Sequence, residues 1–528
     1  MSQNLLTFQE ACDWASKYLE KDVGVSNISY LVQYGKVKKY EKNGFPQVDV
    51  KDLKNYYKSI NGLREFVWKN KLGKDLNWVL SFDDLREKDT TKHVHRLHPY
   101  KGKFIPQLVE YFIDDHIDDF KNNVFFRKGD IVLDPFLGSG TTSIQASELG
   151  IHSVGIDVSR FNCMIAEVKL EDYDIASLEK DIKKVLKAFS NSSKNKMVVQ
   201  FENKLKDKIR EFNDKYFPTP SYKRKLHKKE IKEEKYGKQK EGEFLNTYNQ
   251  LINEYQIELK QEKKKSFLDK WYVKNVRKEI EFVFNEIKKI ENEKNKKALA
   301  LILSRTIRSC RATTHSDLAT LKQPQLTTYY CWKHKKICKP LFSIRYWFVR
   351  YVNDTLKRIK KFNRLKKDAE SLIITADSRN IDISEEIKKK NKKLFDIFSK
   401  KKIKGIFTSP PYVGQIDYHE QHAYAYDLFG FDRKDDLEIG PLYKGKGVDA
   451  RKFYVRGIVE VLNNCKKYLA NDCDIFIVAN DKHNLYPDIA NKSGMKIVNQ
   501  YKRPVLNRTE RDRTPYSETI FHLKSKKE

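Results

Sequence analysis

An apolar strand, a glycine-rich loop, a helix and a second apolar strand follow one another between residues 130 and 158. The first strand ends at Asp134, the loop carries Gly138 and Gly140, and the second strand ends at Asp157. Two strands that are joined by a helix pair in parallel, because the crossover returns the chain to the same end of the sheet. The unit therefore predicts an α/β fold with a mostly parallel sheet.

Further apolar strand patterns return only after a long, highly charged stretch with apolar residues at helical spacing. They lie at residues 371–376, 405–408, 473–479 and 519–523. The sheet is thus expected to be interrupted by helices and completed after them. We expect the following regions: a small α+β domain at 1–60, the first part of the sheet at 90–170, a basic helical insertion at 171–362, and the second part of the sheet at 363–528.

The chain has 104 Lys and Arg against 72 Asp and Glu, a formal charge of +32. Such an excess attracts polyanions, so nucleic acid is the first partner to consider. No apolar run is long enough to span a membrane, and the first residues contain Glu10 and Asp13 instead of the basic patch of a secretory signal. The seven cysteines are scattered, which is typical of a reducing compartment. We expect a cytoplasmic protein with no membrane partner.

The glycine loop differs from two other kinds of ligand-binding loop. A phosphate-binding P-loop needs a Lys after its last glycine, whereas Gly140 is followed by Thr141. The dinucleotide pattern needs a third glycine, and Ser143 stands there. The acidic end of the second strand still fits a ribose, because the Asp157 carboxylate can accept from its hydroxyls.

DPFLGSGTT at residues 134–142 resembles the motif with which amino-directed DNA methyltransferases bind S-adenosylmethionine. The resemblance implies a Rossmann-like methyltransferase sheet, with Asp157 on the cofactor's ribose. HPYKGKFIPQ, at residues 98–107, resembles the segment that flanks the cofactor's methionine end in this family. The implied cofactor-binding residues are Lys103, Phe104, Pro106, Asp134, Pro135, Phe136, Gly138, Gly140, Thr141, Asp157 and Asp377, which follows the strand at 371–376.

The tetrapeptide Ser409-Pro410-Pro411-Tyr412 follows an apolar strand, at the end of the sheet where the cofactor is expected. An exocyclic amino group is a poor nucleophile until hydrogen bonds localise its lone pair. The Ser409 hydroxyl and the Pro410 carbonyl can accept those bonds, and Tyr412 can stack on the base. The tetrapeptide resembles the catalytic (S/D/N)PP(Y/F/W) signature of the same methyltransferases, and all four residues are catalytic candidates.

Serine in the first position of this signature is associated with methylation at N4 of cytosine, whereas adenine N6 enzymes more often have Asp or Asn. Methylation at C5 of cytosine needs a cysteine after a proline, and no cysteine here follows one. The cofactor loop precedes the catalytic signature, an order that many N4 enzymes reverse. Because of the serine, N4 of cytosine is the first expected target. The order of the motifs keeps N6 of adenine open.

The N-terminal 60 residues predict two helices and a small hairpin around Asn43-Gly44. This outline resembles the winged helix-turn-helix domains of the excisionase family, and a purely structural cap is the alternative. The resemblance implies that the second helix enters the major groove of DNA. Its DNA-facing residues would be Asn27, Ser29, Tyr30 and Gln33.

Other candidate DNA contacts lie in the helical insertion and near the C-terminus, where a solvated charged face is the alternative. Those in the insertion are Trp271, Tyr272, Arg305, Arg308 and Arg311. Those near the C-terminus are Arg508, Arg511 and Arg513. Asp417 and Tyr418 resemble residues that line the target-base pocket.

Cys331, His334 and Cys338 have nearly the spacing of metal ligands, and Cys310 or His315 offers a fourth. Because zinc sites usually show two clear ligand pairs, we expect a packed cluster and no metal.

Together these features predict a site-specific methyltransferase that acts on a flipped base of double-stranded DNA with S-adenosylmethionine. The resemblance also implies a restriction-modification setting with a separately encoded endonuclease. The alternatives are an RNA base methyltransferase and a non-catalytic DNA-binding regulator.

Overall fold

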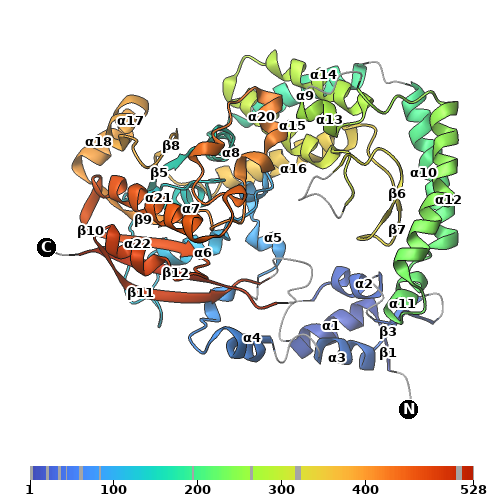
Figure 1. Cartoon of the computed structure of the whole chain (residues 1–528), viewed down its shortest axis with the longest axis horizontal. Helices are drawn as coiled ribbons and strands as arrows, with labels where there is room; N and C mark the ends of the chain where they lie inside the picture. The colour runs from blue at the N-terminus through green and yellow to red at the C-terminus, as the bar shows by residue number, and fades with distance from the viewer. Residues whose placement is uncertain are drawn as a thin grey trace.

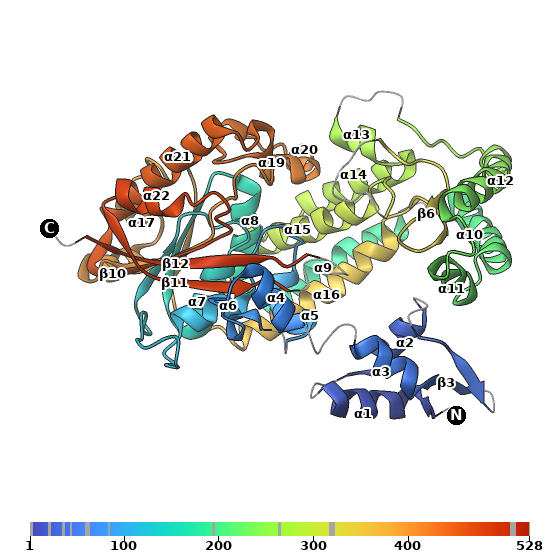
Figure 2. The same cartoon turned by 60° about the horizontal axis from the view of Figure 1, so that its bottom comes forward.

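The computed structural model describes residues 4–19, 23–33, 37–42, 45–58, 64–82, 85–192, 196–261, 266–315, 323–506 and 514–526. Figure 1 shows a sheet with its covering helices at one end of the molecule and long helices at the other. A small N-terminal unit lies apart from the sheet in both views (Figures 1 and 2).

The main sheet has seven strands in the order β11-β12-β10-β9-β4-β5-β8. Neighbours from β10 to β8 are parallel, whereas β12 is antiparallel to both β10 and β11. The strands are β4 (Ile131–Asp134), β5 (His152–Asp157), β8 (Ser371–Thr375), β9 (Ile403–Thr408), β10 (Leu469–Ala479), β11 (Met495–Pro504) and β12 (Ser517–Ser525). This sheet confirms the predicted α/β fold.

Helices cover both faces of the sheet, because successive strand residues point to opposite sides. Ile131 and Leu133 of β4 pack with one helical layer, whereas Val132 packs with the other. The first layer is α17 (Ile383–Lys390), α18 (Lys392–Lys400), α21 (Val448–Lys466) and α22 (Tyr486–Lys492). The second layer includes α6 (Pro106–Ile113) and α7 (Thr141–Leu149).

The helical insertion separates two strands that are neighbours in the sheet. Ser153 of β5 pairs with Ser371 of β8, and their hydroxyls lie 3.0 Å apart although 218 residues separate them. The elements between these strands are α8 (Arg160–Leu170), α9 (Ile175–Asn191), α10 (Lys196–Tyr216), α11 (Ser221–His227), α12 (Glu233–Glu254), α13 (Phe267–Trp271), α14 (Lys274–Lys288), α15 (Glu293–Cys310), the hairpin β6 (Tyr329–Cys331) and β7 (Lys336–Cys338), and α16 (Arg345–Asn363). They share one large apolar core, which also includes Val94, Ile144 and Tyr424 from outside this segment.

The N-terminal unit is a three-stranded antiparallel sheet, in the order β1-β3-β2, with three helices. Its elements are β1 (Leu5–Thr7), α1 (Phe8–Leu19), α2 (Val25–Gln33), β2 (Tyr40–Lys42), β3 (Phe45–Asp49) and α3 (Val50–Lys58). Two helices followed by a hairpin occur as expected, while β1 and α3 were not anticipated. Its classification as a winged helix stays a prediction.

Shorter elements connect these parts. They are α4 (Arg64–Leu72), η1 (Val79–Ser81), α5 (Glu87–Thr90), η2 (His93–Arg96), α19 (Tyr418–Gln421), α20 (Ala423–Phe429), η3 (Asp435–Leu437) and η4 (Leu442–Lys444). Among the described residues, no helix is long and apolar enough to cross a bilayer.

Candidate active site

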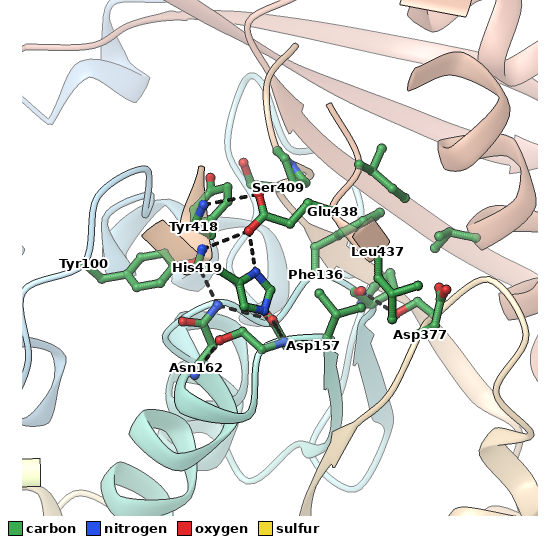
Figure 3. Close-up of a pocket in the computed structure, with 17 residues that line it drawn as sticks. Tyr100, Phe136, Asp157, Asn162, Asp377, Ser409, Tyr418, His419, Leu437 and Glu438 are labelled. Carbon is green, nitrogen blue, oxygen red and sulfur yellow. Dashed lines mark hydrogen bonds and ion pairs between the residues drawn. The ribbon is translucent and has the colours of Figure 1, made fainter. Parts of the chain in front are cut away.

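A cavity opens at the carboxyl ends of β4, β5, β8 and β9, with about 600 Å³ of space that is partly open to solvent. The strand order places four strand ends side by side, so residues distant in sequence meet there. The residues that line it are Tyr100, Pro135, Phe136, Asp157, Val158, Ser159, Asn162, Asp377, Ser378, Ser409, Pro411, Tyr418, His419, Leu437, Glu438, Ile439 and Val461. Figure 3 shows Asp157 beside His419, between Asn162 on one side and Phe136 on the other.

Asp157 ends β5 and offers its carboxylate to the cavity. One carboxylate oxygen accepts from the Gly138 amide at 2.8 Å. The other accepts from the Ser159 amide at 2.8 Å and the Asn162 side chain at 3.2 Å. A carboxylate has about four acceptor positions, so capacity remains for a donor from a ligand. Removal from water raises the pKa of Asp157 to about 6.

The glycine loop requires its two glycines because of close contacts and backbone conformation. Gly138 and Gly140 have φ of +51° and +81°, which side-chain-bearing residues rarely adopt. A Cβ on Gly140 would lie 2.8 Å from the Cβ of Ala166. A Cβ on Gly138 would lie 3.0 Å from the Tyr100 hydroxyl, beside the cavity. The loop therefore brings bare backbone to the edge of the site.

Asp134 lies behind the cavity and connects the two motifs. Its side chain is buried, and its carboxylate accepts from the Thr408 hydroxyl at 2.6 Å and the Phe136 amide at 3.2 Å. Burial raises the pKa of Asp134 to about 6. Since Thr408 precedes Ser409, this bond fixes the catalytic signature against the glycine loop.

The four residues of the catalytic signature face two directions. Ser409 and Pro411 line the cavity that holds Asp157. Tyr412 lines a second cavity, with about 460 Å³ of space that is partly open to solvent, together with Asn480 and other residues that follow β10. Its hydroxyl donates to Glu518 of β12 at 2.8 Å, which fixes the position of the ring. Pro410 is buried and lines neither cavity. The signature therefore contributes side chains to both cavities.

The predicted cofactor residues upstream of the loop lie outside the lining. The Lys103 ammonium donates to the His95 carbonyl at 2.7 Å, and desolvation lowers its pKa to about 8. Phe104 packs edge-on against Phe407, and Pro106 is the first residue of α6. From this segment, Tyr100 lines the cavity instead.

The remaining predicted cofactor residues are placed as follows. Pro135 and Phe136 line the cavity, whereas Thr141 is buried at the start of α7. Asp377 also lines it, and its carboxylate accepts from both Nε and Nη2 of Arg379, at 2.9 and 2.6 Å. The Asp377 carboxylate is thus held in one orientation.

A further wall of the cavity is formed by residues 418–439, of which the sequence indicated only Tyr418. Glu438 is buried and accepts from the amides of Tyr418 at 3.3 Å and His419 at 2.8 Å. These bonds join η3 to α19 and close the cavity on the side facing Asp157. Tyr418, which resembles a residue of the target-base pocket, lies in this wall of the cavity. Asp417 accepts from the Tyr443 amide at 3.1 Å.

The candidate DNA-binding residues of the insertion differ in exposure. Trp271 and Tyr272 belong to the apolar core, with 4% and 1% exposure, so their rings offer almost no surface to DNA. Arg305 is buried and paired with Asp354 at 2.7 Å. Arg311 is buried with its guanidinium over the Tyr424 ring, whereas Arg308 is half-buried at the end of α15. Arg308 is the most accessible of this group.

The other candidates are partly outside the described residues. Asn27 is exposed and Ser29 half-buried on α2, whereas the side chains of Tyr30 and Gln33 are not described. Arg508, Arg511 and Arg513 lie outside the described residues. In the cysteine cluster, His315 joins Cys331, His334 and Cys338, whereas Cys310 is buried in α15.

Comparison with known proteins identifies the family of the chain. The profile of the N6- and N4-directed DNA methylases matches residues 17–168, which include the glycine loop. The Type II methyltransferase M.MjaII of Methanocaldococcus jannaschii is 50% identical over 530 residues, 99% of this chain and 97% of the relative. M.BsoBI of Geobacillus stearothermophilus, another Type II methyltransferase, is 36% identical over 94 residues, 17% of each chain. M2.DpnII of Streptococcus pneumoniae is 35% identical over 100 residues, 19% of this chain and 34% of the relative. The chain therefore belongs to the amino-directed DNA methyltransferases of the Type II restriction-modification class, whose methyl donor is S-adenosylmethionine.

Proposed function

We propose that this enzyme methylates N4 of a flipped cytosine within a short sequence of double-stranded DNA. The observation that carries the proposal is the position of Ser409, which lines the same cavity as Asp157. Ser409, which would bind the target amino group, and Asp157, which would bind the methyl donor, thus line one cavity.

The residues of the cavity fit S-adenosylmethionine. The Asp157 carboxylate has acceptor capacity for a ribose hydroxyl, and the apolar side chains of Phe136, Leu437 and Ile439 suit a flat adenine ring. The bare backbone at Gly138 lets the methionine end approach closely. When bound, the cofactor supplies a methyl group activated by its sulfonium.

The catalytic signature would orient and activate the base. The Ser409 hydroxyl and the Pro410 carbonyl accept hydrogen bonds from the exocyclic amino group, which localises its lone pair for attack. Since Tyr412 faces the second cavity, that cavity is our candidate pocket for the flipped base, with the ring as a stacking surface. Flipping costs a few kcal/mol, which stacking and the new hydrogen bonds offset.

Cytosine N4 is proposed because Ser409 stands in the first position of the signature. Adenine N6 is the second candidate, because the cofactor loop precedes the signature in the chain. The two products differ in mass and retention, so they can be separated after the DNA is digested to nucleosides.

The proposed partners follow from the family and from the charge. A formal charge of +32 favours binding to the phosphates of duplex DNA. A separately encoded endonuclease that cuts the same site is proposed as the functional counterpart, and the cytoplasm is the proposed location.

The test uses the full-length protein, S-adenosylmethionine with a labelled methyl group, and DNA of mixed sequence. We expect label in duplex DNA but not in RNA, and N4-methylcytosine after digestion. Ser409→Ala should lower the methylation rate at least about 100-fold while the Kd for the cofactor changes less than threefold. Ser399→Ala, at an exposed position of α18, is the matched control and should retain full activity. Label in RNA alone, or N6-methyladenine as the only product, would overturn the proposal.

A further inference from the structure

Four cysteine and histidine side chains converge where the chain beyond α15 meets the β6-β7 hairpin. Cys331 ends β6, His334 lies in the turn, Cys338 ends β7, and His315 follows the end of α15. One nitrogen or sulfur atom from each lies within 4.8 Å of those of the other three. The cysteines are free thiols.

The distances within the cluster agree with a tetrahedral metal site. Cys331 Sγ lies 3.6 Å from His315 Nδ1, and Cys338 Sγ lies 3.5 Å from His334 Nδ1. Zinc bonds of about 2.3 Å to sulfur and 2.0–2.1 Å to nitrogen place neighbouring sulfur and nitrogen ligands about 3.6 Å apart. Both pairs thus have the ligand spacing of zinc before any side chain moves.

The turn of the hairpin supports the same assignment. The His334 amide points at Cys331 Sγ, 3.4 Å away, and Lys335 has a φ of +57° that brings the chain back sharply. Cysteine binds zinc as the thiolate, and a hydrogen bond from a backbone amide favours that form.

We propose that His315, Cys331, His334 and Cys338 bind one zinc ion, with two sulfur and two nitrogen ligands. This differs from the sequence-based expectation of a packed cluster, because the second ligand pair is completed by His315 and not by Cys310. The Tyr329 hydroxyl now lies 2.8 Å from His315 Nδ1, and metal binding would replace that contact.

The ion would join two parts of the helical insertion. Asn213 of α10 bonds both backbone groups of Ile337, at 3.0 and 2.9 Å, and Glu241 of α12 accepts from the Tyr330 amide at 3.1 Å. The hairpin is therefore attached to α10 and α12, and Figure 1 shows it beside them. A bound zinc ion would link Cys331 and Cys338 of the hairpin to His315, in the segment that follows α15.

The first test measures metal in the untagged full-length protein, purified without chelator, by mass spectrometry. We expect about one zinc per chain, with no iron or copper. After zinc is removed and cobalt(II) added, tetrahedral sulfur coordination should give strong absorption at 600–750 nm. Protein that holds below about 0.2 zinc per chain after incubation with zinc sulfate, and gives no such spectrum, would overturn the proposal. A Cys331–Cys338 disulfide found by mass mapping would also overturn it.

The second test uses variants. Cys331→Ser and Cys338→Ser should each abolish stoichiometric zinc. His315→Ala, at an exposed position, should weaken zinc binding at least about tenfold without loss of folding. The matched controls, Cys473→Ser in β10 and Tyr329→Phe beside the cluster, should keep one zinc per chain. Full zinc retention in Cys331→Ser and Cys338→Ser would show that the metal lies elsewhere.

Discussion

The Thr408 hydroxyl donates a 2.6 Å hydrogen bond to the Asp134 carboxylate, and this bond joins the carboxyl ends of β9 and β4. Both side chains are buried, so neither group can exchange its partner for water. The glycine loop and the catalytic signature, which are far apart in sequence, are thereby held in one geometry.

Thr408→Val should destabilise the enzyme, because it leaves a buried carboxylate with one donor fewer. The expected cost is about 1–3 kcal/mol, or a thermal midpoint lower by several degrees. Thr408→Ser keeps the hydroxyl and should restore most of the loss. Thr375→Val, at an exposed position that ends β8, is the control. Equal midpoints for Thr408→Val and wild type would contradict this role.

Asp134 should make stability depend on pH. Its folded-state pKa of about 6 lies above the ordinary value, so the folded protein holds this proton more tightly than the unfolded chain does. Its contribution to stability is therefore largest below pH 4 and is lost as pH rises through 6. As pH rises from 4.5 to 7, the thermal midpoint of Asp134→Asn should therefore rise relative to that of wild type. If the thermal midpoints of wild type and Asp134→Asn change with pH in parallel, Asp134 does not contribute this pH dependence.

Asp157→Asn should weaken cofactor binding, since an amide replaces a charged acceptor. A lost charge-assisted hydrogen bond predicts a Kd about 10–100-fold higher, measured by calorimetry. Because the Asp157 pKa is about 6, wild-type affinity should fall as pH drops from 7 to 5. The variant should show a flatter profile. Asp396→Asn, at an exposed position of α18, should behave as wild type in both measurements.

Tyr412 should act through its ring more than through its hydroxyl. Tyr412→Phe removes the bond to Glu518, but Glu518 keeps its ion pair with Arg503 at 3.4 Å. We expect at most a tenfold lower kcat for this variant, and at least a hundredfold loss for Tyr412→Ala, where base stacking is gone. Similar rates for the two variants would refute the stacking role.

Arg308 should contribute a phosphate contact. Arg308 lies near Arg311 and Lys101. The pKa of Lys101 is lowered, first by desolvation and then by the charges of Arg308 and Arg311. Arg308→Gln should weaken binding to all duplexes equally and reduce the slope of log K against log salt by about one. Arg364→Gln, an exposed charge on the far end of α16, should leave the slope unchanged.

The sequence predicted those parts of the site that follow strands directly. Apolar runs ending in Asp134 and Asp157 indicated two strand ends, and Phe136, Asp157 and Ser409 do lie at one cavity. Strand β11 was not anticipated, since it is a partly exposed edge strand whose polar residues give no apolar run.

Other features depend on tertiary contacts that no local pattern records. The spacing of the apolar residues indicated a helix with an apolar face near Trp271. It did not show which helices cover that face. Lys103 was expected at the cofactor, and a carbonyl of η2 binds it instead. Glu438 closes the cavity from a loop whose sequence has no strand or helix signal.

The pairing of β5 with β8 across 218 residues has a consequence for synthesis on the ribosome. At about 5–20 residues per second, β5 waits roughly 10–40 s for its neighbour, with the hydrogen-bonding groups of its edge unpaired. The lining of the candidate cofactor cavity is complete only after Val461 has been made. If this cavity holds the methyl donor as proposed, newly made chains cannot bind it until most of the protein has left the ribosome, and activity appears only with nearly complete molecules.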